Sequence, residues 1–315
     1  MTTQRPVMKR ARVVLAGCVL AAGLAGCAGL PASDAVRLDG VTRIAVISAF
    51  QPELTLLSTR LQAPRKHSVN GVEFTTGTLQ GKPVVMFLSG ISMTNATMNT
   101  QLVLDRFKVS HIVFSGIAGG VNPQLHMGDV TVPAQWGQYL EVLMARETAP
   151  GRFTAPPFIK DATLPNYGML HPRPVEVRSA AEPQVTRKFW FEADPGMLAT
   201  ARNIASVELA NCSAGRCLSR KPQLVVGGNG VSGQAFMDNK AFREYTFNTF
   251  QANVLDMETA SVAMVAHSNG VPYIAFRSLS DLAGGGEGEN EMGAFMGIAA
   301  DNSAKVLLAF LAAWK

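Results

Sequence analysis

The chain has 315 residues, of which 47% are hydrophobic and 16% are charged. This composition excludes a disordered or fibrous protein, and the length suffices for one large α/β domain with a full hydrophobic core. The formal net charge is +5, but residues 1–26 contain four basic and no acidic residues, so the rest of the chain has 24 basic and 23 acidic residues. A balance this close to neutral gives no support for nucleic acid as a partner, and we expect none.

The N-terminal segment is typical of a targeting sequence rather than of a folded domain. Basic residues precede an apolar run at 13–24, which is short for a membrane-spanning helix. The sequence Leu24-Ala-Gly-Cys27 then resembles the lipobox of bacterial lipoproteins, which implies that Cys27 is acylated and begins the mature chain. Cys18 ends a second such match with almost no apolar run before it, and a plain secretory signal or a membrane helix is the alternative interpretation. We expect an exported, lipid-anchored protein that faces the periplasm, with Ala28 indicating the outer membrane.

Strand-like and helix-like runs alternate from about residue 41 onward, which predicts a mainly parallel central sheet with helices on both faces. The apolar runs predict a strand that ends at Met257 and further strands at 44–47, 83–88, 111–115, 128–133, 224–226 and 273–277. Helical periodicity and helix-starting prolines predict one helix that begins at Pro52 and others at 94–107, 195–210, 259–267 and 292–313. Residues 147–178 contain six prolines and little periodicity, so we expect a long surface loop there.

Two cysteines lie beyond the targeting segment, at Cys212 and Cys217, in a short segment that contains glycine. Outside the cytoplasm this spacing favours a disulfide, which would stabilise the fold by on the order of 2 kcal/mol. A zinc site is the alternative, but no histidine lies near the pair and the five histidines share no ligand spacing. We expect a disulfide, no metal and no cofactor.

Three carboxylates follow apolar runs, so we expect them at strand ends, where α/β proteins build ligand sites. Glu53 follows the first strand-like run, Glu258 ends the sequence Asp-Met-Glu, and Asp281 ends the sequence Arg-Ser-Leu-Ser-Asp. By residue type alone each could instead cap a helix, because acidic residues are common in first helical turns. If the three converge, they provide what cleavage of a glycosidic bond requires: a base for water, a ligand for a sugar and an acid for the departing group.

Three motifs in this order resemble the nucleoside phosphorylase/nucleosidase superfamily, and most closely the 5′-methylthioadenosine/S-adenosylhomocysteine nucleosidases. They are Ser115-Gly-Ile-Ala-Gly-Gly120, Asp256-Met-Glu-Thr-Ala260 and Arg277-Ser-Leu-Ser-Asp281. The resemblance extends from about Arg43 to the end of the chain and is weak between 136 and 211. It implies a three-layer α/β/α fold around a mixed, mainly parallel sheet, and a homo-oligomer. The expected organisation is a signal peptide at 1–27, a linker at 28–40 and a catalytic domain at 41–315.

The resemblance also implies the two catalytic roles. Glu53 matches the residue that activates the attacking water, and Asp281 matches the acid that protonates N7 of the leaving purine, with Ser280 beside it. The chemistry supports this, because an oxocarbenium-like transition state requires a neutral leaving base. A partly buried Asp281 with a raised pKa would keep the necessary proton.

Substrate contacts are implied in the same way. Glu258 and Met257 match the ribose contacts, and Phe236 matches the aromatic residue that stacks on the purine. The backbone of the neighbouring Met237 would meet the edge of the base. Two residues of the glycine-rich segment are expected against the substrate, Gly119 and Ile117, the latter at a position where several nucleosidases have serine.

Further departures from the family pattern are Gln51 and Pro52 in place of acids, Ser92 in place of glycine, and Gln234 in place of an acid. Those at 51, 52 and 92, together with Ile117, lie on the expected nucleophile side and bear on the choice between water and phosphate. Phosphorolysis needs a cationic cradle, and neither the strand at 84–89 nor the loop after Ala49 contains lysine or arginine. We therefore expect hydrolysis of a purine nucleoside, such as one with a 5′-alkylthio group. The alternatives are a purine nucleoside phosphorylase and a noncatalytic nucleoside-binding lipoprotein.

Overall fold

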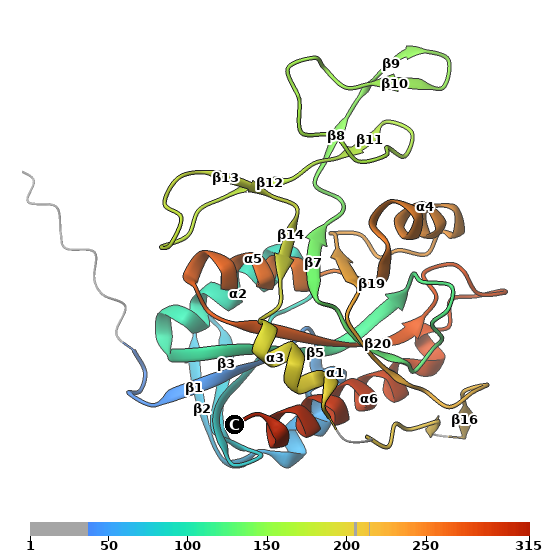
Figure 1. The fold of residues 1–315 in the computed structure, drawn as a ribbon. Helices are drawn as coiled ribbons and strands as arrows, with labels where there is room; N and C mark the ends of the chain where they lie inside the picture. Colours follow the sequence, from blue (N-terminus) through green and yellow to red (C-terminus); the bar gives the residue numbers. More distant parts are fainter. Residues whose placement is uncertain (1–36, 205–206, 214) are drawn as a thin grey trace, which may run out of the picture. The chain divides into compact units, whose positions relative to one another are not determined.

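The computed structural model describes residues 37–204, 207–213 and 215–315, and the structural statements below concern these residues (Figure 1). The expected signal peptide, including the proposed acylation site Cys27, and most of the linker at 28–40 lie outside them.

A mixed sheet of twelve strands forms the centre of the fold. Its main path runs in the order β14-β7-β18-β19-β5-β1-β4-β3-β2. Three strands lie off this path: β20 pairs with β5 and β6, and β6 also pairs with β17. The strands of the parallel core are β1 (Thr42–Ser48), β4 (Lys82–Leu88), β5 (Lys108–Gly120) and β20 (Tyr273–Asp281). The others are β2 (Gln62–Val69), β3 (Val72–Leu79), β6 (Val130–Val132), β7 (Gln135–Gln138), β14 (Trp190–Glu192), β17 (Leu224–Val226), β18 (Asn229–Ser232) and β19 (Ala252–Asp256).

Helices cover both faces of this sheet (Figure 1). The pair α1 (Gln51–Arg60) and α6 (Met292–Ala313) packs together on one side, and α2 (Met93–Arg106) packs with α5 (Thr259–Asn269) on the other. All nine residues of β20 are buried, as expected for a parallel strand covered twice. The three-layer α/β/α fold predicted from the sequence is confirmed.

The C-terminal helix α6 is long and apolar enough to cross a membrane by length and composition alone. It packs against β20 and β5, however, and 56% of its most apolar window is buried in the protein. Its apolar character is therefore accounted for by its place in the core.

Several details of the prediction from sequence are wrong. The helix α3 (Pro195–Arg202) ends eight residues before Ala210, and α4 (Lys240–Phe250), which follows the Asn239 cap, was not predicted. The antiparallel hairpin of β2 and β3 was also missed, although its turn is Asn70-Gly71 with both residues at positive φ. That dipeptide is the strongest short-range signal for a hairpin, and it was obscured because β2 is polar and mostly exposed.

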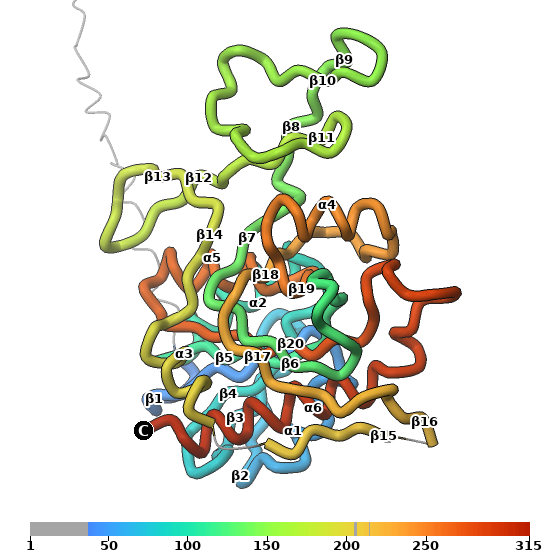
Figure 2. Tube along the Cα trace, turned by 45° about the vertical axis from the view of Figure 1, so that its right-hand side comes forward, coloured from blue at the N-terminus to red at the C-terminus, as the bar shows by residue number. Residues whose placement is uncertain are grey.

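The proline-rich segment is not one long loop but a series of small hairpins outside the central sheet (Figure 2). The hairpin strands are β8 (Val142–Met144) with β11 (Leu170–Pro172), β9 (Arg146–Ala149) with β10 (Arg152–Thr154), and β12 (Val175–Val177) with β13 (Thr186–Lys188). Strands of three or four residues are too short to show a period of two in the sequence, so periodicity could not reveal them.

A fourth small hairpin carries the cysteines. Cys212 in β15 (Cys212–Ser213) lies opposite Cys217 in β16 (Arg216–Cys217), and the two form a disulfide. Both cysteines are exposed.

Candidate functional site

A cavity of about 340 Å³ lies beside the carboxyl ends of β5, β19 and β20, where α/β folds place their ligands. Glu53, Glu258 and Asp281 all line it, although they are far apart in the sequence. Every other residue that the sequence assigned to substrate also lines this cavity, namely Ile117, Gly119, Phe236, Met237, Met257 and Ser280.

Glu53 occupies the first turn of α1, directly after β1, and is buried. Its Oε2 accepts a hydrogen bond from the backbone N–H of Ala49 at 2.6 Å, and its Oε1 accepts one from Ile117 at 2.8 Å. Burial raises the pKa of Glu53 above its ordinary value of 4.5, and Arg277 and the backbone N–H donors oppose that increase. The carboxylate is therefore fixed in position and binds a proton more readily than an exposed glutamate does.

Arg277 is a functional residue that the sequence analysis did not identify. It is fully buried in β20, and its Nε lies 2.8 Å from Asp256 Oδ2. The two terminal nitrogens lie 3.6 Å from Glu53 Oε1 and 3.8 Å from Glu258 Oε2. One guanidinium thus faces three carboxylates, all of which line the cavity. The available signal was a basic residue inside the apolar run of the last strand, four positions before Asp281.

Gly116 is required by this cluster. A Cβ atom at that position would lie 2.0 Å from Arg277 Nη1 and 2.5 Å from Glu53 Oε1. Any larger residue would push the guanidinium and the carboxylate apart, so the glycine of this motif serves close packing of charged groups rather than a turn.

Glu258 lies at the N-terminus of α5 and is buried. Asp256 caps this helix, because its Oδ1 accepts hydrogen bonds from the backbone N–H groups of Glu258 and Thr259, each at 3.1 Å. Glu258 Oε1 accepts a hydrogen bond from the backbone N–H of Ser92 at 2.8 Å. The loop before α2 therefore helps to orient this carboxylate toward the cavity.

Ser92 adopts a backbone conformation that favours glycine, with φ 87° and ψ 153°. We expect Ser92→Gly to raise the free energy of unfolding by roughly 0.5–1 kcal/mol, because glycine reaches this conformation without steric strain. Urea unfolding measures the difference. The matched control is Ser58→Gly in α1, which should destabilise the protein by about 0.5 kcal/mol. If Ser92→Gly were less stable than wild type, the backbone at Ser92 would not be strained.

Asp281 is the last residue of β20 and is buried. The backbone N–H of Ala283 donates to its Oδ1, and the Ser280 hydroxyl donates to its Oδ2, each at 2.8 Å. Burial raises the pKa of Asp281 above 3.8, while donors from Ala283, Ser280 and Asn290 counteract part of the increase. The group is therefore better able to hold a proton than an exposed aspartate.

The opposite wall of the cavity is largely apolar. Phe236 is 55% exposed, which is unusual for a phenylalanine and leaves a ring face available to a flat ligand. Among the described residues that line the cavity, none is lysine or arginine. Within the same part of the chain, no group of histidine, cysteine or acidic residues is arranged to hold a metal ion.

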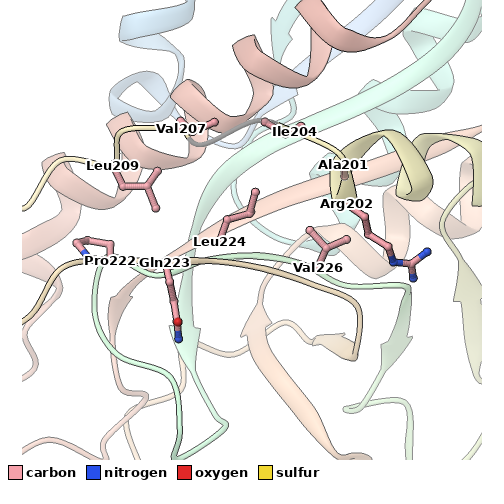
Figure 3. A pocket seen from close by; sticks show the side chains of 9 residues that line it. All are labelled: Ala201, Arg202, Ile204, Val207, Leu209, Pro222, Gln223, Leu224 and Val226. Carbon is pink, nitrogen blue, oxygen red and sulfur yellow. The ribbon is translucent and has the colours of Figure 1, made fainter.

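A second hollow of about 390 Å³ lies between the end of α3 and β17 (Figure 3). Its lining includes Leu209, Leu224 and Val226, and among the residues described there it contains no carboxylate and a single charged residue, Arg202. It offers no pair of acid and base, so we assign the chemistry to the cavity of Glu53 and Asp281.

The sequence profile of the Phosphorylase superfamily matches residues 43–312 of the chain. The chain is 29% identical over 269 residues to a 5′-methylthioadenosine/S-adenosylhomocysteine nucleosidase of Bacillus licheniformis, which covers 84% of this chain and 96% of the relative. It is also similar to a solved structure of the S. pneumoniae nucleosidase of the same name, which was determined with a transition-state inhibitor. The sequence identity is 25% and the TM-score is 0.64, and the match covers 87% of this chain and 100% of the other. The fold also matches futalosine hydrolase of Helicobacter pylori, at 24% identity and a TM-score of 0.64, over 86% of this chain and 97% of that one. The chain therefore belongs to the Phosphorylase superfamily.

Proposed function

We propose that this protein hydrolyses the N-glycosidic bond of purine nucleosides and releases the free base. The observation that carries the proposal is the convergence of Glu53, Glu258 and Asp281 on one cavity whose described lining has no free cation. The nucleosidases to which the chain is similar support the same reaction class.

In the proposed reaction, water attacks C1′ of the ribose while the bond from C1′ to N9 of the purine breaks. Glu53 accepts a proton from the water, and its two backbone hydrogen bonds keep the carboxylate in place for that transfer. Asp281 delivers a proton to N7, so the base departs neutral. Positive charge develops on the sugar, and the carboxylates around the ribose stabilise it.

Glu258 is proposed to accept hydrogen bonds from the 2′- and 3′-hydroxyl groups of the ribose. Arg277 balances part of the negative charge of Glu53, Asp256 and Glu258, and it keeps these acids from being buried without a partner. Phe236 is proposed to stack on the purine, and the backbone of Met237 to meet its edge.

Phosphate is the less suitable nucleophile. Arg277 lies beside the cavity, but its guanidinium is buried and faces three carboxylates. A phosphate ion next to Glu53 would meet a negative charge and no free cation in the described lining. Water has neither difficulty.

The substrate we propose is a nucleoside with an apolar 5′ substituent, such as 5′-methylthioadenosine. Four apolar side chains, Phe50, Ile91, Ile117 and Met292, line the cavity together with Glu53 and Glu258. An alkylthio group would bury its surface against such residues, whereas a 5′-phosphate would not.

Incubation of the purified domain with methylthioadenosine, adenosine and inosine, each with and without phosphate, tests the proposal. We expect free base and the unphosphorylated sugar, at a rate that does not depend on phosphate. Formation of a ribose 1-phosphate would indicate the phosphorylase instead, and tight nucleoside binding with no base release would indicate the binding lipoprotein.

The protein without added nucleoside is expected to lose stability as the pH rises from about 4.5 to about 7. Burial and the neighbouring Asp256 raise the pKa of Glu258 from 4.5 to about 7, against the opposing effects of Arg277 and the Ser92 N–H. The folded state therefore holds this proton more tightly than the unfolded state. Its stabilising contribution, on the order of 3 kcal/mol, is complete below the unfolded pKa and is lost as the pH rises through the folded pKa.

Urea unfolding from about pH 4.5 to about pH 8 measures this contribution, with Glu258→Gln as the comparison because it cannot titrate. We expect the stability of wild type to fall relative to that of Glu258→Gln across the interval. Parallel curves for the two proteins would exclude a raised pKa at this position.

We further propose that the protein is exported, acylated at Cys27 and held at the periplasmic side of the outer membrane as a homo-oligomer. The disulfide between Cys212 and Cys217 supports an oxidising compartment. Labelling with a radioactive fatty acid, with Cys27→Ala as the unlabelled control, tests the anchor. Light scattering of the soluble domain tests the oligomer.

A further inference from the structure

The loop 282–290, which follows Asp281, is fastened to the segment that carries Phe236 and Met237. The Asn290 Nδ2 group donates to Asp238 Oδ1 at 3.0 Å, and Asn290 Oδ1 accepts the backbone N–H of Met292 at 2.9 Å. The amide nitrogen therefore joins the acid-bearing loop to Asp238, the residue after Met237, while the amide oxygen holds the start of α6.

A second attachment lies at the start of the same loop. The backbone N–H of Asn239 donates to the carbonyl oxygen of Ala283 at 3.2 Å. Gly284 packs so closely that a Cβ there would lie 2.4 Å from the Asn239 nitrogen. Ala283 is fully buried and has a positive φ of 52°, a conformation that alanine adopts only when its surroundings impose it.

This imposed conformation has a direct effect on the acid. It aims the N–H of Ala283 at Asp281 Oδ1, 2.8 Å away. The Asn290 amide also opposes the increase of the Asp281 pKa that burial causes. A backbone N–H can only donate, so the proton of neutral Asp281 belongs on Oδ2, whose other contact is the Ser280 hydroxyl, a group that can accept as well as donate.

We propose that Asn290 is a positioning residue for Asp281, which acts by fastening the loop 282–290 to Asp238 of the base-stacking segment. The inference rests on the proposed function, because the position of the acid matters only if Asp281 protonates a leaving group. The stacking residue and the proton donor are thereby held on one connected unit, so a purine stacked on Phe236 meets an acid at a fixed distance.

The first test compares Asn290→Ala with Asn248→Ala, an identical substitution at an exposed position of α4. With methylthioadenosine, Asn290→Ala should lower kcat by roughly 10- to 100-fold and change KM by less than about threefold, since the acid acts in the transition state. Asn248→Ala should match wild type. An Asn290→Ala variant with the kcat of wild type would overturn the proposal.

A second substrate separates positioning of the acid from a general loosening of the site. The ribosyl bond of 4-nitrophenyl riboside breaks to release a stable phenolate, which needs no proton from the enzyme. Asn290→Ala should cleave it about as fast as wild type does. An equal loss of kcat for both substrates would show a merely structural role and would overturn the proposal.

A double-mutant cycle with Asp238→Ala tests the connection itself. If Asn290 acts through Asp238, the single variants should lose similar amounts of kcat for the nucleoside, and the double variant should lose little more than either. Fully additive losses would contradict this route. If the proposed function itself were wrong, the wild-type protein would release no base from the nucleoside, which distinguishes that outcome from a failure of this positioning role.

Discussion

Asp281→Asn is expected to lower kcat for a purine nucleoside by roughly 10²- to 10⁴-fold, the usual contribution of a general acid. Asparagine keeps the shape of the side chain, its Oδ1 can still accept the N–H of Ala283, and its amide can still meet the Ser280 hydroxyl. It has no acidic proton, so the purine would have to leave as an anion. Steady-state release of free base measures the loss.

Two comparisons make this result specific. Asp105→Asn, at an exposed position on α2, should leave kcat unchanged. Cleavage of 4-nitrophenyl riboside should be nearly unaffected by Asp281→Asn, because its leaving group needs no protonation. If the variant released purine at the wild-type rate, Asp281 would not be the acid, and the assignment of the reaction to this end of the cavity would fail.

Glu53→Gln should also reduce kcat by roughly 10²- to 10⁴-fold while the affinity for nucleoside changes little. The amide cannot accept a proton from water, but it retains the volume of the carboxylate between Ala49 and Ile117. Single-turnover base release measures the first quantity, and equilibrium binding of methylthioadenosine measures the second.

The fold of this variant requires its own check, because Glu53 accepts two backbone N–H groups and one end of glutamine is a donor. Glu53→Gln will lose one of these hydrogen bonds, at a cost of about 1–3 kcal/mol, and the unfolding midpoint should fall accordingly. Glu73→Gln, on the exposed face of β3, is the matched control and should affect neither activity nor stability. Unchanged turnover with Glu53→Gln would leave the noncatalytic binder as the better interpretation.

The sequence allowed the three cavity acids to be proposed because each ends a motif that is local in the chain. Asp281 ends a strand and Glu258 lies two residues beyond the end of another, and an apolar run followed by a carboxylate makes both positions visible. Arg277 was missed for the opposite reason. The carboxylates that make its burial tolerable lie on α1, at the end of β19 and at the start of α5, and no local pattern shows that the fold brings these three elements to one side chain.

Elements with weak periodicity also could not be predicted from the sequence. The loop 282–290 looks like a flexible, glycine-rich acidic stretch, yet its attachment to Asp238 and Asn239 depends on which loops the sheet brings together. The positive φ of Ala283 could not be predicted, since nothing in an alanine signals that conformation. Tertiary contacts, rather than propensity, determine the structure at these positions.

Under the proposed export, the exposed disulfide would record the compartment in which each molecule matured. Cys212 and Cys217 are accessible, so in a precursor retained in the reducing cytoplasm both sulfurs would be free thiols open to alkylation by a maleimide. Molecules that had crossed the inner membrane would be protected until a reductant was added. A gel-shift assay at this pair would therefore count exported against retained protein in intact cells, without a fused reporter.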